Sequence, residues 1–431
     1  MRARYFRFTT VAVAIAAAAA CASSEDEVTP PPGPDGGQTP LGDGGDSTTD
    51  ASADCAALPD VTAPESGSLQ TCSAAGWCLT ELPDPELTIR DIWPFEKKAF
   101  ASVWSTTRGN RVIEWNEDIA PGTGWKYIDD GTQRGIPGNP NRIWAPNEDE
   151  VYYSIDLTST TFTGTWGGFL FHGKRPIPPA TAWTWTSTRF DCDTQRDLRV
   201  WGIGGDVYAL SCGRIYRMTG DLDADGGVVG DAGTPSWTVE YTDDDPTTLW
   251  LQGGVGVPDD IWFVAARGSN LRCTTIVRKT AAGYQRIVDG VQNGPLSCVE
   301  KPGYPMVPAL TDFISITPGE IVGVSYRPQG AVLVKIAVDG QGEVSVTEVK
   351  PGLGQQFGSL WSGSLDEAWL VADTYRIVHG SAIWSDAASF QYSTIALNGL
   401  PNESSLLKIR GTSTSNLWAV GTDRAFHKTT P

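Results

Sequence analysis

A short three-residue phrase recurs seven times along this chain, and it limits the fold more than any other feature. Each copy has a polar residue, a small or aliphatic residue and a third residue that is hydrophobic, and it opens a short alternating strand. The third positions are separated by 52, 56, 54, 60, 47 and 49 residues. A period near 50 is typical of one four-stranded propeller blade. The copies are Lys98–Phe100, Glu150–Tyr152, Asp206–Tyr208, Asp260–Trp262, Glu320–Val322, Glu367–Trp369 and Asn416–Trp418.

Each repeat divides into four short strands, which we call a to d. Examples are Leu87–Trp93 for strand a, Asp260–Ala265 for strand b, Gly168–His172 for strand c and Trp125–Ile128 for strand d. Gly, Pro, Asp and Asn bound these runs, as expected for consecutive hairpins. One blade cannot bury both faces of its sheet, but blades stacked in a ring can. The sequence therefore predicts an all-β, seven-bladed β-propeller of four-stranded antiparallel blades.

The two ends of the repeat region indicate how the ring closes. The last unit, Leu406–Pro431, supplies strands a, b and c and then stops, whereas a spare strand d precedes the first unit at about residues 76–82. We therefore expect this N-terminal strand to complete the last blade of a propeller that spans residues 67–431, with repeats from about residue 86. If the weak fifth unit at Phe313–Val349 is irregular, six blades remain an alternative, and eight is another.

The N-terminus has the pattern of a secretory signal peptide at residues 1–20. Three arginines precede the apolar run Val11–Ala20, which is too short to span a bilayer. The run ends at Cys21 and so resembles a bacterial lipoprotein box, in which the cysteine is lipidated and becomes the first mature residue. The departure from that pattern is Ala18, where a larger aliphatic residue is usual. The alternative is ordinary cleavage that leaves a secreted protein.

The segment that follows, residues 21–66, has the composition of a flexible tether. From Ala22 to Ser66 it carries ten acidic residues, no Lys or Arg, and runs of Pro and Gly, so we expect it not to fold. Together with Cys21, it predicts a propeller held at the cell envelope by a lipid, at the outer membrane or the cell surface. The formal net charge of −19 and the lack of a basic patch argue against nucleic acid as a partner.

Eight cysteines in a chain with a signal peptide indicate an oxidising compartment. Local pairing predicts two disulfides, Cys192 with Cys212 and Cys273 with Cys298, and each would stabilise the fold by roughly 3 kcal/mol through loop closure. If Cys21 carries lipid, the remaining three cysteines cannot all pair with one another: Cys55, Cys72 and Cys78.

The phrase Asp260–Val264 and the aromatic-led strand Ser236–Thr238 resemble propeller repeats of secreted and lipid-anchored bacterial proteins, and in outline tectonin-like and BNR-type repeats. The resemblance covers about residues 76–431 and implies the fold rather than a function, because propellers host lectins, hydrolases, dehydrogenases and scaffolds. The Asp box of sialidases is absent at its nearest match, Ser154–Leu157.

Most of the 17 tryptophans occupy repeat-equivalent positions, including Trp250 in strand a, and we interpret these as packing between blades. Trp166 differs, because it ends an expanded Thr/Ser-rich loop that begins at Asp156. We therefore take Trp166 and Asp156 as candidate ligand-binding residues. The ligand would be met at the end of the ring that carries the longer b–c loops, at residues 156–167 and 265–274.

Asp221, Asp223 and Asp225 stand on alternate residues before a glycine and resemble the opening of a calcium loop. The acidic residue that would complete such a loop is absent, since Val229 and Ala232 stand where those loops place it. An acidic turn is the simpler interpretation, so calcium is the one cofactor left open. The three histidines end equivalent c strands and do not suggest a shared metal: His172, His379 and His427.

No nucleophile elbow, catalytic triad, phosphate-binding loop or dinucleotide fingerprint is present. The favoured interpretation is therefore a monomeric, non-enzymatic binding or scaffolding module whose ligand is an unidentified protein or glycan. Two alternatives remain: a secreted hydrolase that acts on glycans through carboxylates facing one another in a deep axial pocket, and a glycan-binding lectin.

Overall fold

The computed structural model describes residues 71–118, 124–158, 160, 163–193, 197–219, 221–222, 228–229, 236–246, 248–268, 273–293, 298–327, 330–353, 356–373 and 375–430. All of them belong to the second of two units into which the chain divides, Ser66–Pro431. The expected signal peptide and the whole of the tether, with Cys21 and Cys55, lie outside these residues. Within them, no helix is both long and apolar enough to cross a bilayer.

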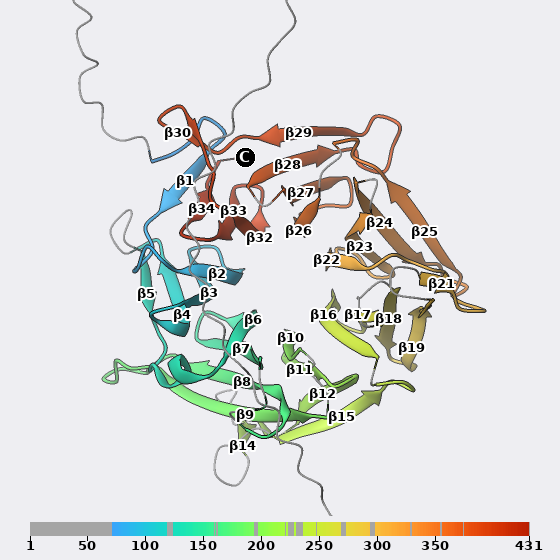
Figure 1. Cartoon of the computed structure of the whole chain (residues 1–431), viewed down its shortest axis with the longest axis horizontal. Coiled ribbons are helices and arrows are strands. Elements are labelled where there is room, and N and C mark those ends of the chain that lie inside the picture. Colours follow the sequence, from blue (N-terminus) through green and yellow to red (C-terminus); the bar gives the residue numbers. More distant parts are fainter. Residues whose placement is uncertain are drawn as a thin grey trace, which may run out of the picture. The chain divides into compact units, whose positions relative to one another are not determined.

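Seven antiparallel sheets of four strands surround a central axis, which confirms the predicted seven-bladed propeller (Figure 1). The first three blades are β2 (Thr88–Pro94), β3 (Lys98–Ser105), β4 (Gly109–Asn116), β5 (Trp125–Tyr127); β6 (Gly138–Asn147), β7 (Glu150–Leu157), β8 (Trp166–Lys174), β9 (Thr184–Cys192); and β10 (Arg199–Ile203), β11 (Asp206–Ser211), β12 (Arg214–Thr219), β15 (Ser236–Thr242).

The fourth, fifth and sixth blades are β16 (Leu249–Val257), β17 (Asp260–Arg267), β18 (Cys273–Thr280), β19 (Gly283–Val288); β22 (Leu310–Ile314), β23 (Glu320–Arg327), β24 (Gly330–Val338), β25 (Val344–Val349); and β26 (Phe357–Trp361), β27 (Glu367–Ala372), β28 (Arg376–Ser381), β29 (Ser389–Ser393). The seventh blade comprises β32 (Leu406–Ser413), β33 (Asn416–Gly421), β34 (Ala425–Lys428) and β1 (Trp77–Thr80).

The ring closes as the sequence predicts, with the N-terminal strand as the outer strand of the last blade. β1 pairs antiparallel with β34, in a register that sets Trp77 opposite Lys428 and Leu79 opposite Phe426. Trp77 is fully buried, and its indole N–H donates a hydrogen bond to Ser393 Oγ of blade 6 at 3.0 Å. The closing strand therefore joins two blades through one side chain.

The recurring phrase is explained by a contact that repeats from blade to blade. Its third residue lies on strand b directly opposite a cationic or imidazole residue on strand c, as in Trp262 opposite Arg278. The guanidinium of Arg278 lies 5.0 Å from the Trp262 ring centroid, and its Nε lies 2.5 Å from Asp260, the first residue of the phrase. In this blade the first residue of the phrase, an acid, and the third, an aromatic ring, therefore both contact the same arginine.

The first blade exchanges these charges. Its phrase begins with Lys98, and Glu114 stands opposite Phe100 where the other blades have Arg, Lys or His. Lys98 pairs with Glu148 at 2.6 Å, and Glu114 pairs with Arg175 at 2.5 Å.

Tryptophans at the ends of inner strands pack between blades, as predicted. Trp144 of blade 2 lies on Gly202 of blade 3, where an added Cβ would be 2.5 Å from the indole. Trp201 of blade 3 lies on Gly254 of blade 4 in the same way, at 2.7 Å. Because glycine has no side chain, the next blade can approach the flat ring closely.

Three disulfides are present, and two join the pairs expected from the sequence, Cys192–Cys212 and Cys273–Cys298. The third joins Cys72 to Cys78. Multiple disulfides indicate an extracytoplasmic protein.

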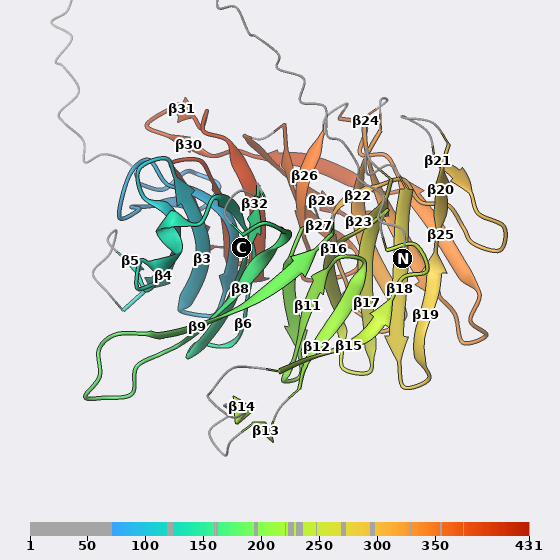
Figure 2. The same ribbon diagram turned by 60° about the horizontal axis from the view of Figure 1, so that its bottom comes forward.

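Three short hairpins extend the propeller between its blade strands: β13 (Asp221–Leu222) with β14 (Val228–Val229), β20 (Gly290–Gln292) with β21 (Cys298–Glu300), and β30 (Ala396–Leu397) with β31 (Leu400–Pro401). β20–β21 and β30–β31 lie on one face of the ring, and β13–β14 lies on the opposite face (Figure 2).

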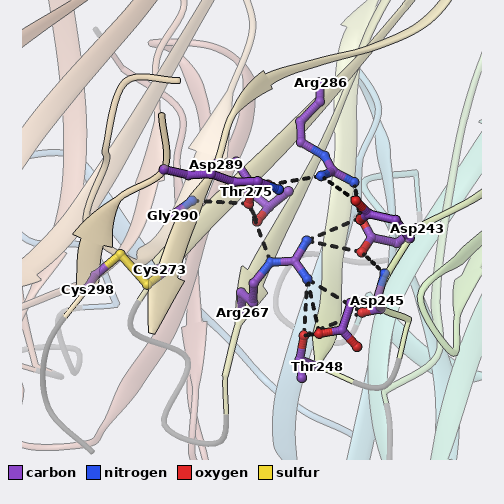
Figure 3. Close-up of polar contacts among 12 residues, drawn as sticks. Asp243, Asp245, Thr248, Arg267, Cys273, Thr275, Arg286, Asp289, Gly290 and Cys298 are labelled. Carbon is purple, nitrogen blue, oxygen red and sulfur yellow. Dashed lines mark hydrogen bonds and ion pairs between the residues drawn. A yellow bond between two sulfur atoms is a disulfide. The ribbon is translucent and has the colours of Figure 1, made fainter. Parts of the chain in front are cut away.

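A buried ion network fixes the junction of blades 3 and 4 beside the disulfide Cys273–Cys298 (Figure 3). Asp243 comes directly after β15 and has no exposed side-chain surface. It accepts hydrogen bonds from Arg267 at 3.0 Å and from Arg286 at 2.7 Å, both of blade 4. Asp289 is equally buried and accepts from Arg286 at 3.0 Å. Since both buried carboxylates are paired, this network holds the interblade loop against blade 4.

Candidate functional site

The inner strands of the seven blades line an axial channel that holds two cavities. One, which we call the polar chamber, has a volume of about 530 Å³, and the other, the aromatic chamber, about 430 Å³. The polar chamber is lined mainly by the first halves of the inner strands and the aromatic chamber mainly by their second halves, so they open toward opposite ends of the ring. Asp91 and Arg142 line both and therefore lie between them.

Antiparallel alternation explains which loops surround the polar chamber. Strand a begins where strand b ends, so the chamber opens on the face that carries the b–c loops and the connections between blades. Asp156 reaches it from the end of β7, opposite Asn139 of β6. This is the face at which the sequence predicts the ligand to be met.

Asp312 of β22 is the centre of a buried ion cluster on the axis. Its side chain has no exposed surface. Arg410 of β32 donates two hydrogen bonds to it, at 2.8 and 3.1 Å. Arg142 of β6 donates another at 3.3 Å. Ser359 Oγ and the Leu360 backbone N–H, both of β26, donate at 2.7 and 3.1 Å.

This cluster, which we call the axial hub, joins blades 2, 5, 6 and 7 through one carboxylate. Burial by itself would raise the pKa of Asp312, but the positive charges of Arg410, Lys408 and Arg142 outweigh it and hold that pKa well below its usual range. Asp312 is therefore ionised and paired. The axial hub therefore links four blades across the centre of the ring, and it lies between the two chambers.

Arg199, the first residue of β10, holds two carboxylates in the polar chamber. It contacts Asp156 at 2.9 Å and Asp197 at 2.6 Å. Asp156 also accepts a hydrogen bond from the Leu198 backbone N–H at 2.5 Å. Burial raises the pKa of Asp156 to about 7, while Arg199 opposes the rise and Asp197 adds to it. Asp156 therefore changes charge near neutral pH.

Lys408 of β32 is a second titratable group in the polar chamber. Its ammonium group lies 3.6 Å from Asp312, and its side chain is 16% exposed. Burial lowers the pKa of Lys408 to about 8; Asp312 opposes that change, whereas Arg142 and Arg410 reinforce it. Two chamber groups thus titrate between about pH 7 and 8, a property that marks functional sites more often than surfaces.

Several polar atoms around the polar chamber lack hydrogen-bond partners in the part of the chain that the structure describes. They are Arg90 Nε, Asn141 Nδ2 and Gln252 Oε1. Arg90 makes no ion pair with any described residue. Buried polar groups are normally satisfied, so unpaired donors and acceptors gathered around one cavity are evidence that it receives a polar ligand.

The two ligand-binding residues proposed from the sequence do not meet in one site. Asp156 lines the polar chamber, whereas Trp166, the first residue of β8, lines neither chamber. The Trp166 carbonyl accepts a hydrogen bond from Arg189 at 3.0 Å within its own blade.

The placement of Trp250 at the position equivalent to the other strand-a tryptophans is wrong. Val255, not Trp250, is the β16 residue that stands opposite Trp262, as Trp201 stands opposite Tyr208 in blade 3. Trp250 lines the polar chamber instead. The cause is the length of β16, whose register shifts between Leu251 and Gly253.

Sequence reasoning missed most of the axial residues. A signal was present, because five of the seven inner strands carry charged residues beside apolar ones. Those residues are Arg90, Asp91, Arg142, Arg199, Asp312, Lys408 and Arg410.

The calcium candidate lies mostly outside the described residues. Asp223 and Asp225 lie outside the described residues, and Asp221 is described only as part of β13. Among the residues that are described, no group of three or more His, Cys, Asp or Glu side chains could hold a metal ion.

No protein-family model matches the chain, and no curated protein sequence matches it. Solved propellers are similar in fold. The structure of YCF48 bound to D1 peptide is 13% identical, with a TM-score of 0.51 over 84% of this chain and 100% of that one. YCF48 from Cyanidioschyzon merolae is 11% identical, with a TM-score of 0.51 over 83% and 99%. The extracellular domain of BT4673 from B. thetaiotaomicron is 12% identical, with a TM-score of 0.48 over 82% and 40%.

These identities show a shared fold alone. The resemblance to tectonin-like and BNR-type repeats is thus supported as far as the propeller architecture and no further.

Proposed function

We propose that this protein is an extracytoplasmic binding module that receives a carboxylate-bearing segment of a partner protein in its polar chamber. The observation that carries the proposal is Arg90, whose guanidinium has no carboxylate partner among the described residues although it lines the cavity. A guanidinium presents N–H donors in the geometry that a carboxylate accepts.

The charge of the chamber supports an anionic ligand. Its lining has four cationic side chains, Arg90, Arg142, Arg199 and Lys408, against three carboxylates. The raised pKa of Asp156 reduces the negative charge of the lining near neutral pH. The cavity is thus positively charged although the whole chain has a net charge of −19. Its low-dielectric walls strengthen the electric field that an anionic ligand would meet. YCF48, which shares the propeller fold, has been solved bound to D1 peptide, and this supports a peptide as the kind of ligand.

A glycan hydrolase is less well supported. Such an enzyme needs two carboxylates that face each other across the substrate. Here Asp156 and Asp197 share the guanidinium of Arg199, and Asp91 lies 3.9 Å from Arg410. Each chamber carboxylate is therefore held next to an arginine, an arrangement that suits binding.

The test uses a pair of short peptides that differ only in a free C-terminal carboxylate or a C-terminal amide, with binding measured by titration calorimetry. The free acid should bind at least tenfold more tightly than the amide. Arg90→Gln should remove most of that difference, because a charge-assisted hydrogen bond contributes about 1.5–3 kcal/mol. Lys350→Met, an exposed change outside both chambers, is the control. Equal binding of acid and amide would reject the proposal.

We further propose that Cys21 is lipidated and that residues 21–66 form a tether that holds the propeller away from a membrane. The apolar run before Cys21 and the acidic, Pro/Gly-rich composition after it support this. Mass spectrometry of the mature N-terminus should find a diacylglyceryl cysteine. Cys21→Ala should move the protein from the membrane fraction to the soluble fraction, and a mature chain that begins elsewhere without lipid would contradict the anchor.

A further inference from the structure

The aromatic chamber at the other end of the channel has a different chemistry from the polar chamber. Four inner strands each contribute a tryptophan to its wall: Trp93 of β2, Trp144 of β6, Trp201 of β10 and Trp361 of β26. Phe313 of β22 adds a fifth ring. Trp93 and Trp201 are half-buried, whereas Trp144 and Trp361 are largely covered by packing on the next blade. Trp93 and Trp201 are therefore the more exposed of the four rings.

The indole N–H groups of this wall have no acceptor among the described residues. None of the four tryptophans donates a hydrogen bond there, and none of their nitrogens belongs to the fully buried unpaired atoms. Five tryptophans outside the chamber donate to a protein oxygen: Trp77, Trp125, Trp185, Trp369 and Trp384. In three others, Trp237, Trp262 and Trp418, the indole nitrogen is fully buried without an acceptor, so a ligand could not reach it. The four indole N–H groups around this cavity are thus unpaired and not fully buried, which favours a ligand that carries hydrogen-bond acceptors.

The floor of the aromatic chamber is polar. Asp91 is 3% exposed, and its Oδ2 accepts a hydrogen bond from the Ile143 backbone N–H at 3.3 Å. Its Oδ1 accepts none, although Arg410 Nε lies 3.9 Å from it. Arg142 and Arg410 complete the floor, and both are already bound to Asp312. The floor thus offers a buried carboxylate oxygen as an acceptor for a ligand donor.

We infer that the aromatic chamber binds a neutral saccharide of one or two pyranose rings. The apolar C–H face of such a ring stacks on an indole, its hydroxyl oxygens accept from the indole N–H groups, and one hydroxyl donates to Asp91 Oδ1. A purely apolar ligand would leave Asp91 Oδ1 unpaired, which is unfavourable. A cationic ligand would meet the guanidinium groups of Arg142 and Arg410. A neutral ring rich in hydroxyl groups satisfies both the walls and the floor.

This site is separate from the one in the proposed function. The two chambers share only Asp91 and Arg142 in their linings, and the axial hub lies between them. The saccharide would enter from the face opposite the b–c loops. Either site can therefore fail in an experiment without the other.

The experiment measures binding of a panel of neutral disaccharides, namely cellobiose, N,N′-diacetylchitobiose and lactose, to the full chain by calorimetry and by tryptophan fluorescence. At least one should bind and change the emission of the chamber tryptophans. Trp93→Ala should weaken that binding by roughly tenfold or more. Trp93→Phe, which keeps a ring but removes the N–H, should weaken it by a smaller factor.

A second kind of variant keeps the test decisive if Trp93→Ala does not fold. Ser315→Trp places a large side chain in the chamber wall and should abolish saccharide binding while the melting temperature stays close to that of the parent chain. Trp384→Phe, a change outside both chambers, is the control. Arg90→Gln distinguishes the two sites, because it should weaken the carboxylate peptide and not the saccharide.

Two results would overturn the inference. One is that no disaccharide of the panel binds at millimolar concentration to the folded chain. The other is that a disaccharide binds equally well to the Ser315→Trp variant, which would place the sugar elsewhere.

Discussion

Trp418 and His427 lie face to face on adjacent strands of the last blade, with ring centroids 4.2 Å apart and planes 7° from parallel. His427 Nε2 lies 2.8 Å from Asn416 Oδ1, so the first residue of the repeated phrase orients the ring that stacks on the third. The same stack occurs between Tyr152 and His172, at 4.1 Å and 7°. The repeat is therefore a repeat of one local contact between strands b and c.

Acid should destabilise the fold through His427. Burial lowers the pKa of His427 to about 4, whereas an unfolded histidine has a pKa of about 6.5. Below pH 6.5 the unfolded chain gains a proton that the folded chain does not, so the free energy of unfolding should fall by up to about 3 kcal/mol between pH 6.5 and 4. Denaturant unfolding across this range measures the slope.

Two variants assign that slope to the imidazole. His427→Phe should be less stable at pH 7 but show a shallower loss toward pH 4. Asn416→Ala removes the same hydrogen bond yet keeps the titrating ring, so its slope should persist. An unchanged slope in His427→Phe would show that other groups govern the acid response.

Removal of Asp312 should strongly destabilise the propeller. Asp312→Ala leaves Arg410, Arg142 and Lys408 without their shared buried carboxylate, and the loss of one partner of a buried ion pair costs about 3–5 kcal/mol. Denaturant unfolding at pH 7 checks this against Asp366→Ala, an exposed change. If the free energy of unfolding fell by less than about 1 kcal/mol, the axial hub would not be a main source of the ring's stability.

Binding of a carboxylate peptide should become tighter as pH falls from 9 to 6. Lys408 gains its proton near pH 8 and Asp156 gains one near pH 7, and both changes add positive charge to the polar chamber. We expect about a tenfold decrease in Kd, which corresponds to about 1.4 kcal/mol. Lys408→Met should remove the upper part of this dependence and Asp156→Asn the lower part. Binding that is equal at both pH values would contradict the assignment.

Ring closure should depend on Trp77. Trp77→Ala leaves a cavity between blades 6 and 7, and the loss of a fully buried indole costs about 3–5 kcal/mol. Trp77→Phe keeps most of the ring but loses the hydrogen bond to Ser393, so its cost should be smaller. Thermal or denaturant unfolding ranks the three proteins. If Trp77→Ala were as stable as the parent chain, closure by β1 would contribute little.

The architecture could be read from the sequence because each blade is built from contacts between neighbouring strands. The third residue of the phrase and its opposing residue are separated by about 10 to 20 positions, as Tyr152 and His172 are, so hairpin pairing alone brings them together. The local cysteine pair Cys192–Cys212 follows from the same short-range spacing. The closing strand at Trp77 pairs with the far end of the chain and follows instead from counting strands, because the last repeat lacks the strand d that precedes the first.

The axial sites could not be read in this way. Arg142 and Asp312 are 170 residues apart and meet only because a closed ring points one residue of each inner strand at the same axis. A shift in the register of one strand also changes which of its side chains face the axis, as for Trp250 of β16. The repeat, counted strand by strand along the sequence, thus determined the number of blades and their closure, whereas the convergence of distant strands in the tertiary structure decided which charges and rings share a cavity.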